Sequence, residues 1–158
     1  MKWASRLAFV MPLFLITGAL ISQYVFGLYP CEMCIWQRWP HYGAILLAGV
    51  SLLVSSRDIA KLFTALAGLA ILGSGLIGGF HAGVEYGWWE GITACSTGFE
   101  QGLDADQIMD AILDAPIIRC DAAPWDFYGI SLAGFNFLLS LGAAIAIFML
   151  MHKSRKAG

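Results

Sequence analysis

Charged residues are scarce in this chain. Only 13% of its 158 residues are Asp, Glu, Lys or Arg, and 59% are hydrophobic. A soluble domain carries about 25% charged residues, and the mean hydropathy here is +0.72. The shortage of charge therefore excludes an ordinary water-soluble domain and indicates a membrane protein.

Motifs for the common redox cofactors are also missing. The sequence has no glycine-rich phosphate-binding loop and no flavin, haem or nucleotide motif, and no internal repeat is evident. This pattern excludes a nucleotide-dependent oxidoreductase. We likewise expect no metal centre and no nucleic-acid partner.

Four stretches lack charge for roughly the 17–25 residues that a spanning helix needs. They are Leu7–Cys31, Trp39–Ser56, Leu62–Val84 and Phe127–His152. We predict an all-α membrane protein, a four-helix bundle forming one domain over residues 1–158. The expected spans are about 7–27, 39–56, 62–82 and 128–151, with outer loops at about 28–38 and 83–127.

The distribution of basic residues predicts the orientation of these spans, because cytoplasmic loops are enriched in Lys and Arg. Seven of the nine basic residues fall on the side that holds both termini, and ten of the eleven acids fall on the other. We expect both termini in the cytoplasm and the first span to be retained rather than cleaved as a signal peptide. The seven are Lys2, Arg6, Arg57, Lys61, Lys153, Arg155 and Lys156.

All four cysteines fall in the predicted outer loops. Cys31 and Cys34 form a C-x-x-C pair in the first loop, and Cys95 and Cys120 lie in the long second loop. In an oxidising compartment an even number of cysteines indicates disulfides. A C-x-x-C bridge closes too short a loop to restrict much chain entropy, which favours a redox couple over a structural brace. Structural disulfides and a four-thiolate zinc site are the alternatives.

Between Cys95 and Cys120 the segment "LDADQIMDAILDAP" predicts a short amphipathic helix. Asp104 is a candidate N-cap, and Pro116 lies past the end. Such a helix could rest on the membrane surface or pack on the end of the bundle. Nearby, Trp88 and Trp89 are typical of the aromatic belt at the membrane interface.

Arg38 follows Cys34 by four residues, so the two share a face wherever this segment is helical. A guanidinium at this position could stabilise a thiolate, as could a helix N-terminus, or it could extend to lipid phosphate. Pro40 disfavours a regular first turn. His41 and His81 are expected near the same end of the bundle, either as acceptor ligands or simply as hydrogen-bonded histidines.

Oxidising a dithiol releases two electrons, and no cofactor motif in this chain receives them. The depth of Cys34 at the membrane boundary suggests a lipid-soluble two-electron acceptor, a quinone. The stretch "CEMCIWQR" is similar to the C-x-x-C-x-x-Q-R signature of the DsbB family. The stretch "WDFYGIS" at the start of the last span also resembles that family.

The resemblance implies an inner-membrane thiol:quinone oxidoreductase that reoxidises a periplasmic DsbA-type protein and supports disulfide bond formation. It implies that Cys95 is attacked by the partner, that Cys120 is its mate, and that electrons pass to Cys31–Cys34. Arg38, Cys34 and, less directly, His81 would then bind the quinone, either ubiquinone or menaquinone. Gln37 matches the signature without an assigned role.

Two other functions are compatible with the same residues. A non-enzymatic four-span scaffold would use its cysteines for structure only. A relative working with one dedicated thiol partner would have the same cysteine arrangement as a general oxidant of DsbA-type proteins.

Overall fold

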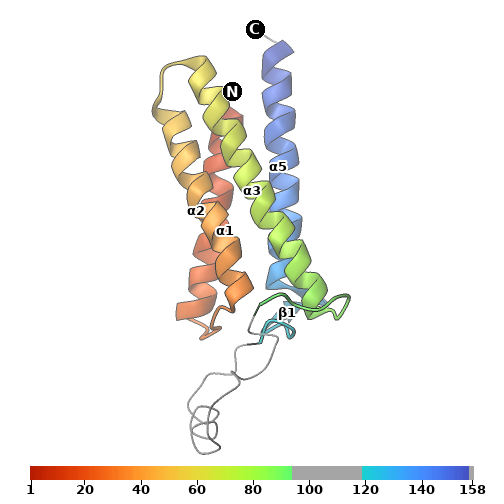
Figure 1. Cartoon of the computed structure of the whole chain (residues 1–158). Coiled ribbons are helices and arrows are strands. Elements are labelled where there is room, and N and C mark those ends of the chain that lie inside the picture. The colour runs from red at the N-terminus through yellow and green to blue at the C-terminus, as the bar shows by residue number, and fades with distance from the viewer. Residues whose placement is uncertain (94–118, 157–158) are drawn as a thin grey trace, which may run out of the picture.

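The computed structural model describes residues 1–93 and 119–156 of this chain. It contains four long helices: α1 (Lys2–Tyr24), α2 (Glu32–Leu53), α3 (Arg57–Glu85) and α5 (Leu132–Lys156). The start of α1, the end of α5 and the α2–α3 turn lie at one end of the bundle, and the α1–α2 loop and the segment just before α5 lie at the other, which we call the cysteine end (Figure 1). The predicted loop helix between Cys95 and Cys120 falls outside the described residues.

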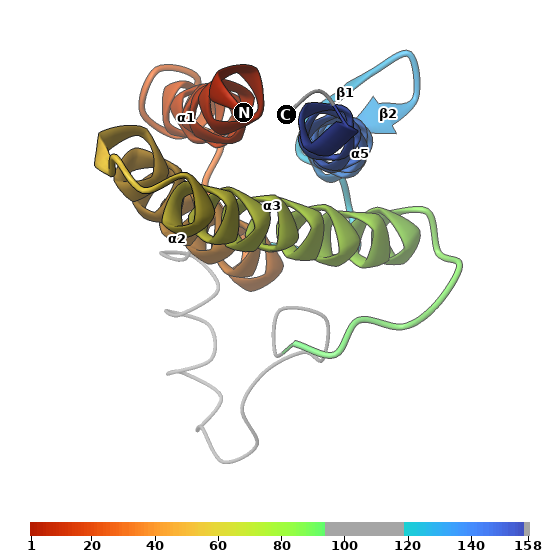
Figure 2. The ribbon, with the colours of Figure 1, turned by 90° about the horizontal axis from the view of Figure 1, so that it is seen from above.

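Helix α3 occupies the centre of the bundle, with α2 along one side and α5 along the other (Figure 2). Small side chains allow these helices to approach closely. A Cβ added to Gly75 would lie 2.9 Å from the Ser140 side chain, and one added to Gly79 would lie 2.9 Å from Phe137. These two glycines therefore lie at a close interface between α3 and α5, whereas Gly142 has no atom within 4 Å of its Cβ position.

The interior is apolar in the middle of the bundle and carries buried polar side chains toward both ends, such as Ser51 at the terminal end and His81 at the cysteine end. The apolar cluster consists of Ala8, Ala44, Ala48, Ala67, Ile71, Ala143 and Ile147. Large side chains such as Leu46, Leu53 and Met149 are exposed on the outside. An outer surface of large apolar side chains is suited to a membrane, because lipid tails solvate it.

Three of the described helices are long and apolar enough to cross a membrane: Lys2–Tyr24, Arg57–Glu85 and Leu132–Ser154. Helix α2 is less apolar because its first half carries Glu32, Gln37, Arg38 and His41. It nevertheless packs inside the same bundle, against α1 and α3. The polar half of α2 is thus placed where the four helices meet at the cysteine end.

The structure differs from the expectations at two places around the loops. Helix α2 begins at Glu32 and continues through Pro40, so the segment that we expected as a loop at 28–38 is largely helical. A short antiparallel hairpin, β1 (Asp126–Phe127) and β2 (Ile130–Ser131), precedes α5 and was not anticipated. Its turn uses Tyr128 and Gly129, both with positive φ, and Gly129 adopts that conformation without steric cost.

Candidate active site

The C-x-x-C pair lies at the N-terminus of α2. Cys31 is the N-cap residue, and its sulfur accepts a hydrogen bond from the backbone N–H of Cys34 at 3.2 Å. The two sulfur atoms are 2.7 Å apart. The hydrogen bond with Cys34, aided by burial, raises the pKa of the Cys31 thiol far above its ordinary value. The same hydrogen bond lowers the pKa of the Cys34 thiol, which favours a thiolate on Cys34 at the positive end of the helix dipole.

Cys120 belongs to the same buried cluster as Cys31. The two sulfur-bearing residues pack together with Met33 and Val84, and Cys120 is fully buried. The hydroxyl of Thr93 donates to the Cys120 sulfur at 3.3 Å. The structure thus brings together one cysteine from each sequence pair, whereas Cys95 falls outside the described residues.

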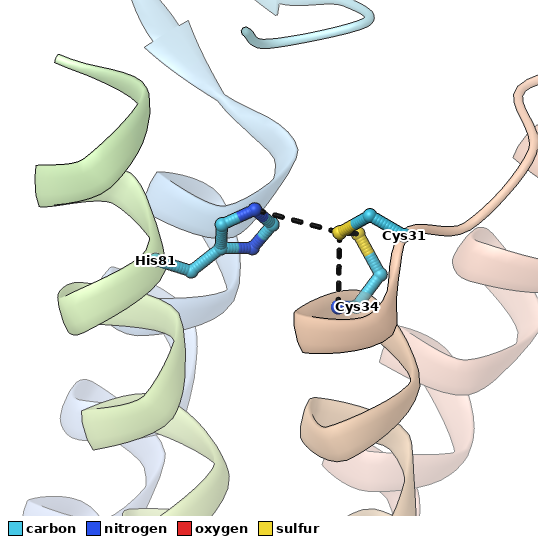
Figure 3. Close-up of side chains that lie close together, drawn as sticks. All are labelled: Cys31, Cys34 and His81. Carbon is cyan, nitrogen blue, oxygen red and sulfur yellow. Dashed lines mark hydrogen bonds between the residues drawn. The ribbon is translucent and has the colours of Figure 1, made fainter. Parts of the chain in front are cut away.

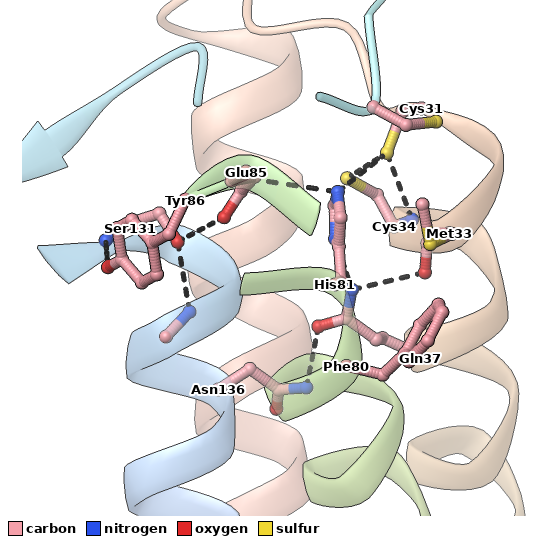
Figure 4. A network of polar contacts seen from close by, with 12 residues as sticks. Cys31, Met33, Cys34, Gln37, Phe80, His81, Glu85, Tyr86, Ser131 and Asn136 are labelled. Atoms are coloured by element: carbon pink, nitrogen blue, oxygen red, sulfur yellow. Dashed lines mark hydrogen bonds and ion pairs between the residues drawn. The ribbon is translucent and has the colours of Figure 1, made fainter. Parts of the chain in front are cut away.

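His81 reaches this cluster from α3. Its Nε2 atom lies 3.5 Å from the Cys31 sulfur (Figure 3). The same atom lies 3.8 Å from a carboxylate oxygen of Glu85 (Figure 4). The other Glu85 oxygen accepts a hydrogen bond from the hydroxyl of Ser131, the last residue of the hairpin. His81 is 2% exposed, so its contacts are made inside the protein.

Gln37 connects the cysteine end of α2 to α3 and α5. Its Nε2 donates to the Met33 carbonyl at 3.1 Å and lies 2.9 Å from Nδ1 of His81 (Figure 4). Because the carbonyl can only accept, Nε2 must face it, and the remaining amide hydrogen points to His81. Neutral His81 therefore accepts at Nδ1 and carries its hydrogen on Nε2, where it can donate to the Cys31 sulfur.

The opposite side of Gln37 is held by Asn136 of α5. Asn136 Nδ2 donates to Gln37 Oε1 at 2.8 Å and to the Ser74 carbonyl at 3.2 Å. Its Oδ1 faces Nε2 of His41 at 2.9 Å. One chain of hydrogen bonds thus runs from His81 through Gln37 and Asn136 to His41.

Arg38 is held against α1 rather than against Cys34. Its guanidinium donates to Gln23 Oε1 at 2.6 Å and to the Ala19 carbonyl at 3.5 Å. Arg38 and Cys34 nevertheless line the same cavity, as their spacing predicted. The arginine therefore presents a fixed positive charge at the wall of that cavity.

Two cavities meet at Cys34. The helix cavity, of about 220 Å³, lies between α1, α2 and α5, and its lining includes Phe14, Arg38 and Asn136. The loop cavity, of about 270 Å³, is lined by Cys31, His81, Glu85, Arg119 and the loop residues beside them. Cys34 lines both, whereas His81 lines only the loop cavity.

Sequence reasoning did not anticipate Gln23, Glu85 or Asn136. Gln23 and Asn136 are amides within otherwise apolar spans, and such residues usually face the bundle interior and have a function. That signal was available in the sequence. The partners of these residues come from distant helices, so their contacts were not.

Cys31, Cys34 and His81 also place two sulfurs and an imidazole nitrogen within 4.8 Å of one another. The hydrogen-bond network is unfavourable for a metal at this position. A metal bound at Nε2 would transfer the imidazole hydrogen to Nδ1, where it would face the donating amide of Gln37.

Comparison with known proteins identifies the family. The model of the family "Disulfide bond formation protein DsbB" matches residues 1–150. The chain belongs to the DsbB family. It is therefore an oxidoreductase of disulfide bond formation and a multi-pass membrane protein. The predicted four-helix membrane architecture is confirmed, since DsbB proteins are four-span bundles.

Individual DsbB relatives are similar over most of their length. Disulfide bond formation protein B of Polaromonas is 30% identical over 153 residues, which cover 88% of this chain and 83% of the relative. The protein of the same name from Azoarcus is 32% identical, covering 88% and 86%. An uncharacterized protein of Rickettsia prowazekii is 28% identical, covering 89% and 83%. No solved structure matches this chain.

Proposed function

We propose that this DsbB family member oxidises the dithiol of a periplasmic DsbA-type protein and passes two electrons to a membrane quinone, ubiquinone or menaquinone. The observation that supports this proposal best is the position of Cys34 between two cavities. One side of Cys34 adjoins Cys31 and the residues around Cys120, and the other adjoins the cavity beside Arg38.

The cysteine relay follows from thiol–disulfide exchange. A partner thiolate attacks the sulfur of Cys95 in a Cys95–Cys120 disulfide, and Cys120 leaves as the thiolate. The second partner thiol then displaces Cys95, so the partner gains one disulfide. The buried packing of Cys120 with Cys31 supports the next exchange, in which the Cys31–Cys34 disulfide is reduced while Cys95–Cys120 reforms.

The helix cavity fits a quinone head group. Most of its lining is apolar, including Phe14, Ile16 and Phe135, and its polar groups are concentrated on α2 and at Asn136. A bound quinone supplies an acceptor for two electrons and two protons, which reoxidises Cys31–Cys34 to the disulfide. Cys34 would deliver the electrons, and Arg38 would hold negative charge that develops on the acceptor oxygen.

His81 has a different role in this proposal from the one that its sequence position suggested. Its Nε2–H faces the Cys31 sulfur from the loop cavity. It would stabilise negative charge on Cys31 when exchange with Cys120 breaks the Cys31–Cys34 bond. Direct quinone binding by His81 remains the prediction of the family resemblance.

The proposed orientation places the cysteines in the periplasm. The basic residues of the described chain gather mainly at the end of the bundle that carries both termini. By the positive-inside tendency this end would be cytoplasmic. The redox pairs would then lie at the outer leaflet, where a periplasmic partner and a membrane quinone could both reach them.

A reconstituted reaction tests this function. Purified protein in detergent is mixed with a reduced DsbA-type protein and a short-chain benzoquinone, and quinone absorbance is followed. We expect one quinone reduced per partner disulfide formed, and no reduction with Cys34→Ser. If folded protein with intact cysteines consumes no quinone with several DsbA-type partners, the proposal is wrong.

A trapping experiment tests the path between the two pairs. Removing Cys34 leaves Cys31 without its mate, so a Cys31–Cys120 bridge should accumulate in Cys34→Ser. Peptide mapping by mass spectrometry without reductant would detect it. Its absence, together with an intact Cys95–Cys120 bridge and free Cys31 after exposure to oxidised partner, would contradict direct exchange.

A further inference from the structure

His41 is a buried histidine in the wall of the helix cavity, and its ring is paired on one side only. The residue is 3% exposed and lines the cavity together with Cys34 and Arg38. Nε2 is hydrogen-bonded to Asn136 Oδ1 at 2.9 Å. In the described part of the chain, Nδ1 of His41 is the one buried side-chain nitrogen or oxygen atom without a hydrogen-bond partner. A buried polar atom of this kind needs a ligand or water to complete its bonding.

The surrounding network determines which ring nitrogen of His41 carries the hydrogen. Asn136 Nδ2 must face the Ser74 carbonyl, because that oxygen can only accept. Asn136 Oδ1 therefore faces His41 and Ser140, whose hydroxyl also donates to it at 3.0 Å. Since Oδ1 is an acceptor, Nε2 of His41 must be the donor. The neutral imidazole then presents Nδ1 as a hydrogen-bond acceptor.

No acidic side chain of the described residues is hydrogen-bonded to His41, whose side-chain partner is the amide of Asn136. Burial without a carboxylate partner favours the neutral ring. The residues that line the cavity therefore include one positive group, Arg38, and one histidine, His41, whose Nδ1 is an acceptor without a partner within the described residues. Arg38 donates hydrogen bonds and so pairs with an oxygen atom that accepts. His41 Nδ1 accepts and so pairs only with an oxygen atom that carries a hydrogen.

This pair of groups distinguishes the two redox forms of a quinone. A quinone has carbonyl oxygens, which only accept, whereas the hydroquinone has two O–H donors. Arg38 can donate to either form, but neutral His41 can pair only with a hydroxyl. Building on the proposed function, we infer that His41 Nδ1 accepts a hydrogen bond from a hydroxyl of the reduced acceptor, so that the helix cavity binds hydroquinone more tightly than quinone.

The redox balance of the step is unchanged by this contact. The Cys31 and Cys34 thiols are oxidised to a disulfide and release two electrons and two protons, and the quinone takes up both to become the hydroquinone. Preferential binding of the reduced form raises the effective reduction potential of the acceptor in the site. A tenfold preference corresponds to about 30 mV for two electrons, which draws electrons out of the cysteines.

The experiment compares binding of both redox forms in the full-length chain. A Cys34→Ala background prevents turnover, and anaerobic equilibrium dialysis in detergent measures the dissociation constants of a short-chain benzoquinone and its hydroquinone. His41→Leu removes the acceptor at similar volume. Asn136 Oδ1 keeps its bond from Ser140 in that variant, so the fold should persist. His152→Leu, at an exposed histidine near the terminal end, is the matched control.

We expect His41→Leu to weaken hydroquinone binding about five- to tenfold, the equivalent of one hydrogen bond, and to leave quinone binding nearly unchanged. His41→Gln, whose amide can still donate to Asn136 while offering its oxygen, should restore most of the preference. His152→Leu should behave as the background protein does.

Equal losses for both redox forms would mean that His41 only shapes the cavity, and the inference would be overturned. If His41→Leu fails to fold, the Cys34→Ala background protein alone tests the inference. Equal affinity of that protein for the benzoquinone and its hydroquinone would contradict it. Failure of the oxidised native chain, which keeps Cys34, to bind either form would instead overturn the proposed quinone function, and this inference with it.

Discussion

The side-chain nitrogen of Gln37 lies 2.9 Å from Nδ1 of His81, joining the helix that carries the C-x-x-C pair to the central helix of the bundle. This bond orients the imidazole so that Nε2 faces the Cys31 sulfur. Through Asn136, the same glutamine also determines the state of His41. One amide therefore influences both cavities that meet at Cys34.

Replacing Gln37 by leucine should lower both stability and activity. The substitution leaves Nδ1 of His81 without its donor and removes one partner of Asn136, and unsatisfied buried polar groups cost about 1–3 kcal/mol each. We expect the free energy of unfolding, measured with denaturant in detergent, to fall by a similar amount. Oxidation of the partner should slow several-fold.

Ser51→Ala is the control for this variant. Ser51 lies in a buried hydroxyl cluster with Ser5 and Thr64, whose residues belong to three helices. Its loss should cost roughly 0.6 kcal/mol per bond without changing the oxidation rate. A Gln37→Leu protein that matches the native chain in both measurements would refute the role assigned to this network.

Arg38→Met should impair the use of quinone rather than the reaction with the thiol partner. Hydrogen bonds to charged groups contribute about 1.5–3 kcal/mol, so the KM for quinone should rise at least about tenfold. Gln23→Leu, which releases one side of the guanidinium, should raise it only a few-fold. The KM for quinone of each variant follows from initial rates of quinone reduction at a saturating concentration of the reduced partner.

Arg6→Met provides the matched control, since Arg6 is exposed on α1 near the terminal end and stacks on Trp3. It should leave the KM unchanged. A normal KM in Arg38→Met would exclude this arginine as the charge that faces the acceptor.

Gly75→Ala should separate α3 from α5. The added methyl group would lie 2.9 Å from the Ser140 side chain, and overpacking of this kind typically costs about 1–3 kcal/mol. We expect a lower Tm in detergent. Gly142→Ala, on α5 with nothing within 4 Å of the new carbon, should be neutral. Equal effects of the two substitutions would contradict the assigned helix interface.

Much of this architecture could be predicted from the sequence because membrane insertion depends on local properties. Runs without charge predicted four helices. The C-x-x-C-x-x-Q-R signature predicted the family, which is confirmed. The hairpin before α5 was missed because two-residue strands carry almost no periodic signal, and its turn depends on the backbone conformations of Tyr128 and Gly129.

The site could be predicted only in part. The cysteines and Arg38 were singled out from residue type and spacing, and the resemblance to DsbB proteins added their roles and His81. The structure brings Cys31, Cys34, Cys120 and His81 to the same end of the bundle. The expectation that Pro40 would disturb the first turn of α2 was wrong. Helix α2 runs through Pro40, as packing against neighbouring helices can satisfy the backbone around a proline.

By itself, the sequence determined that this chain enters a membrane and carries a helix with a dithiol at its start, since hydrophobicity and spacing are properties of single segments. Only the tertiary structure decided that Gln37, Asn136 and the two histidines form one chain of hydrogen bonds, and that Cys34 stands between two cavities. Hydrogen bonds are directional and short, so they depend on how three helices are placed against one another.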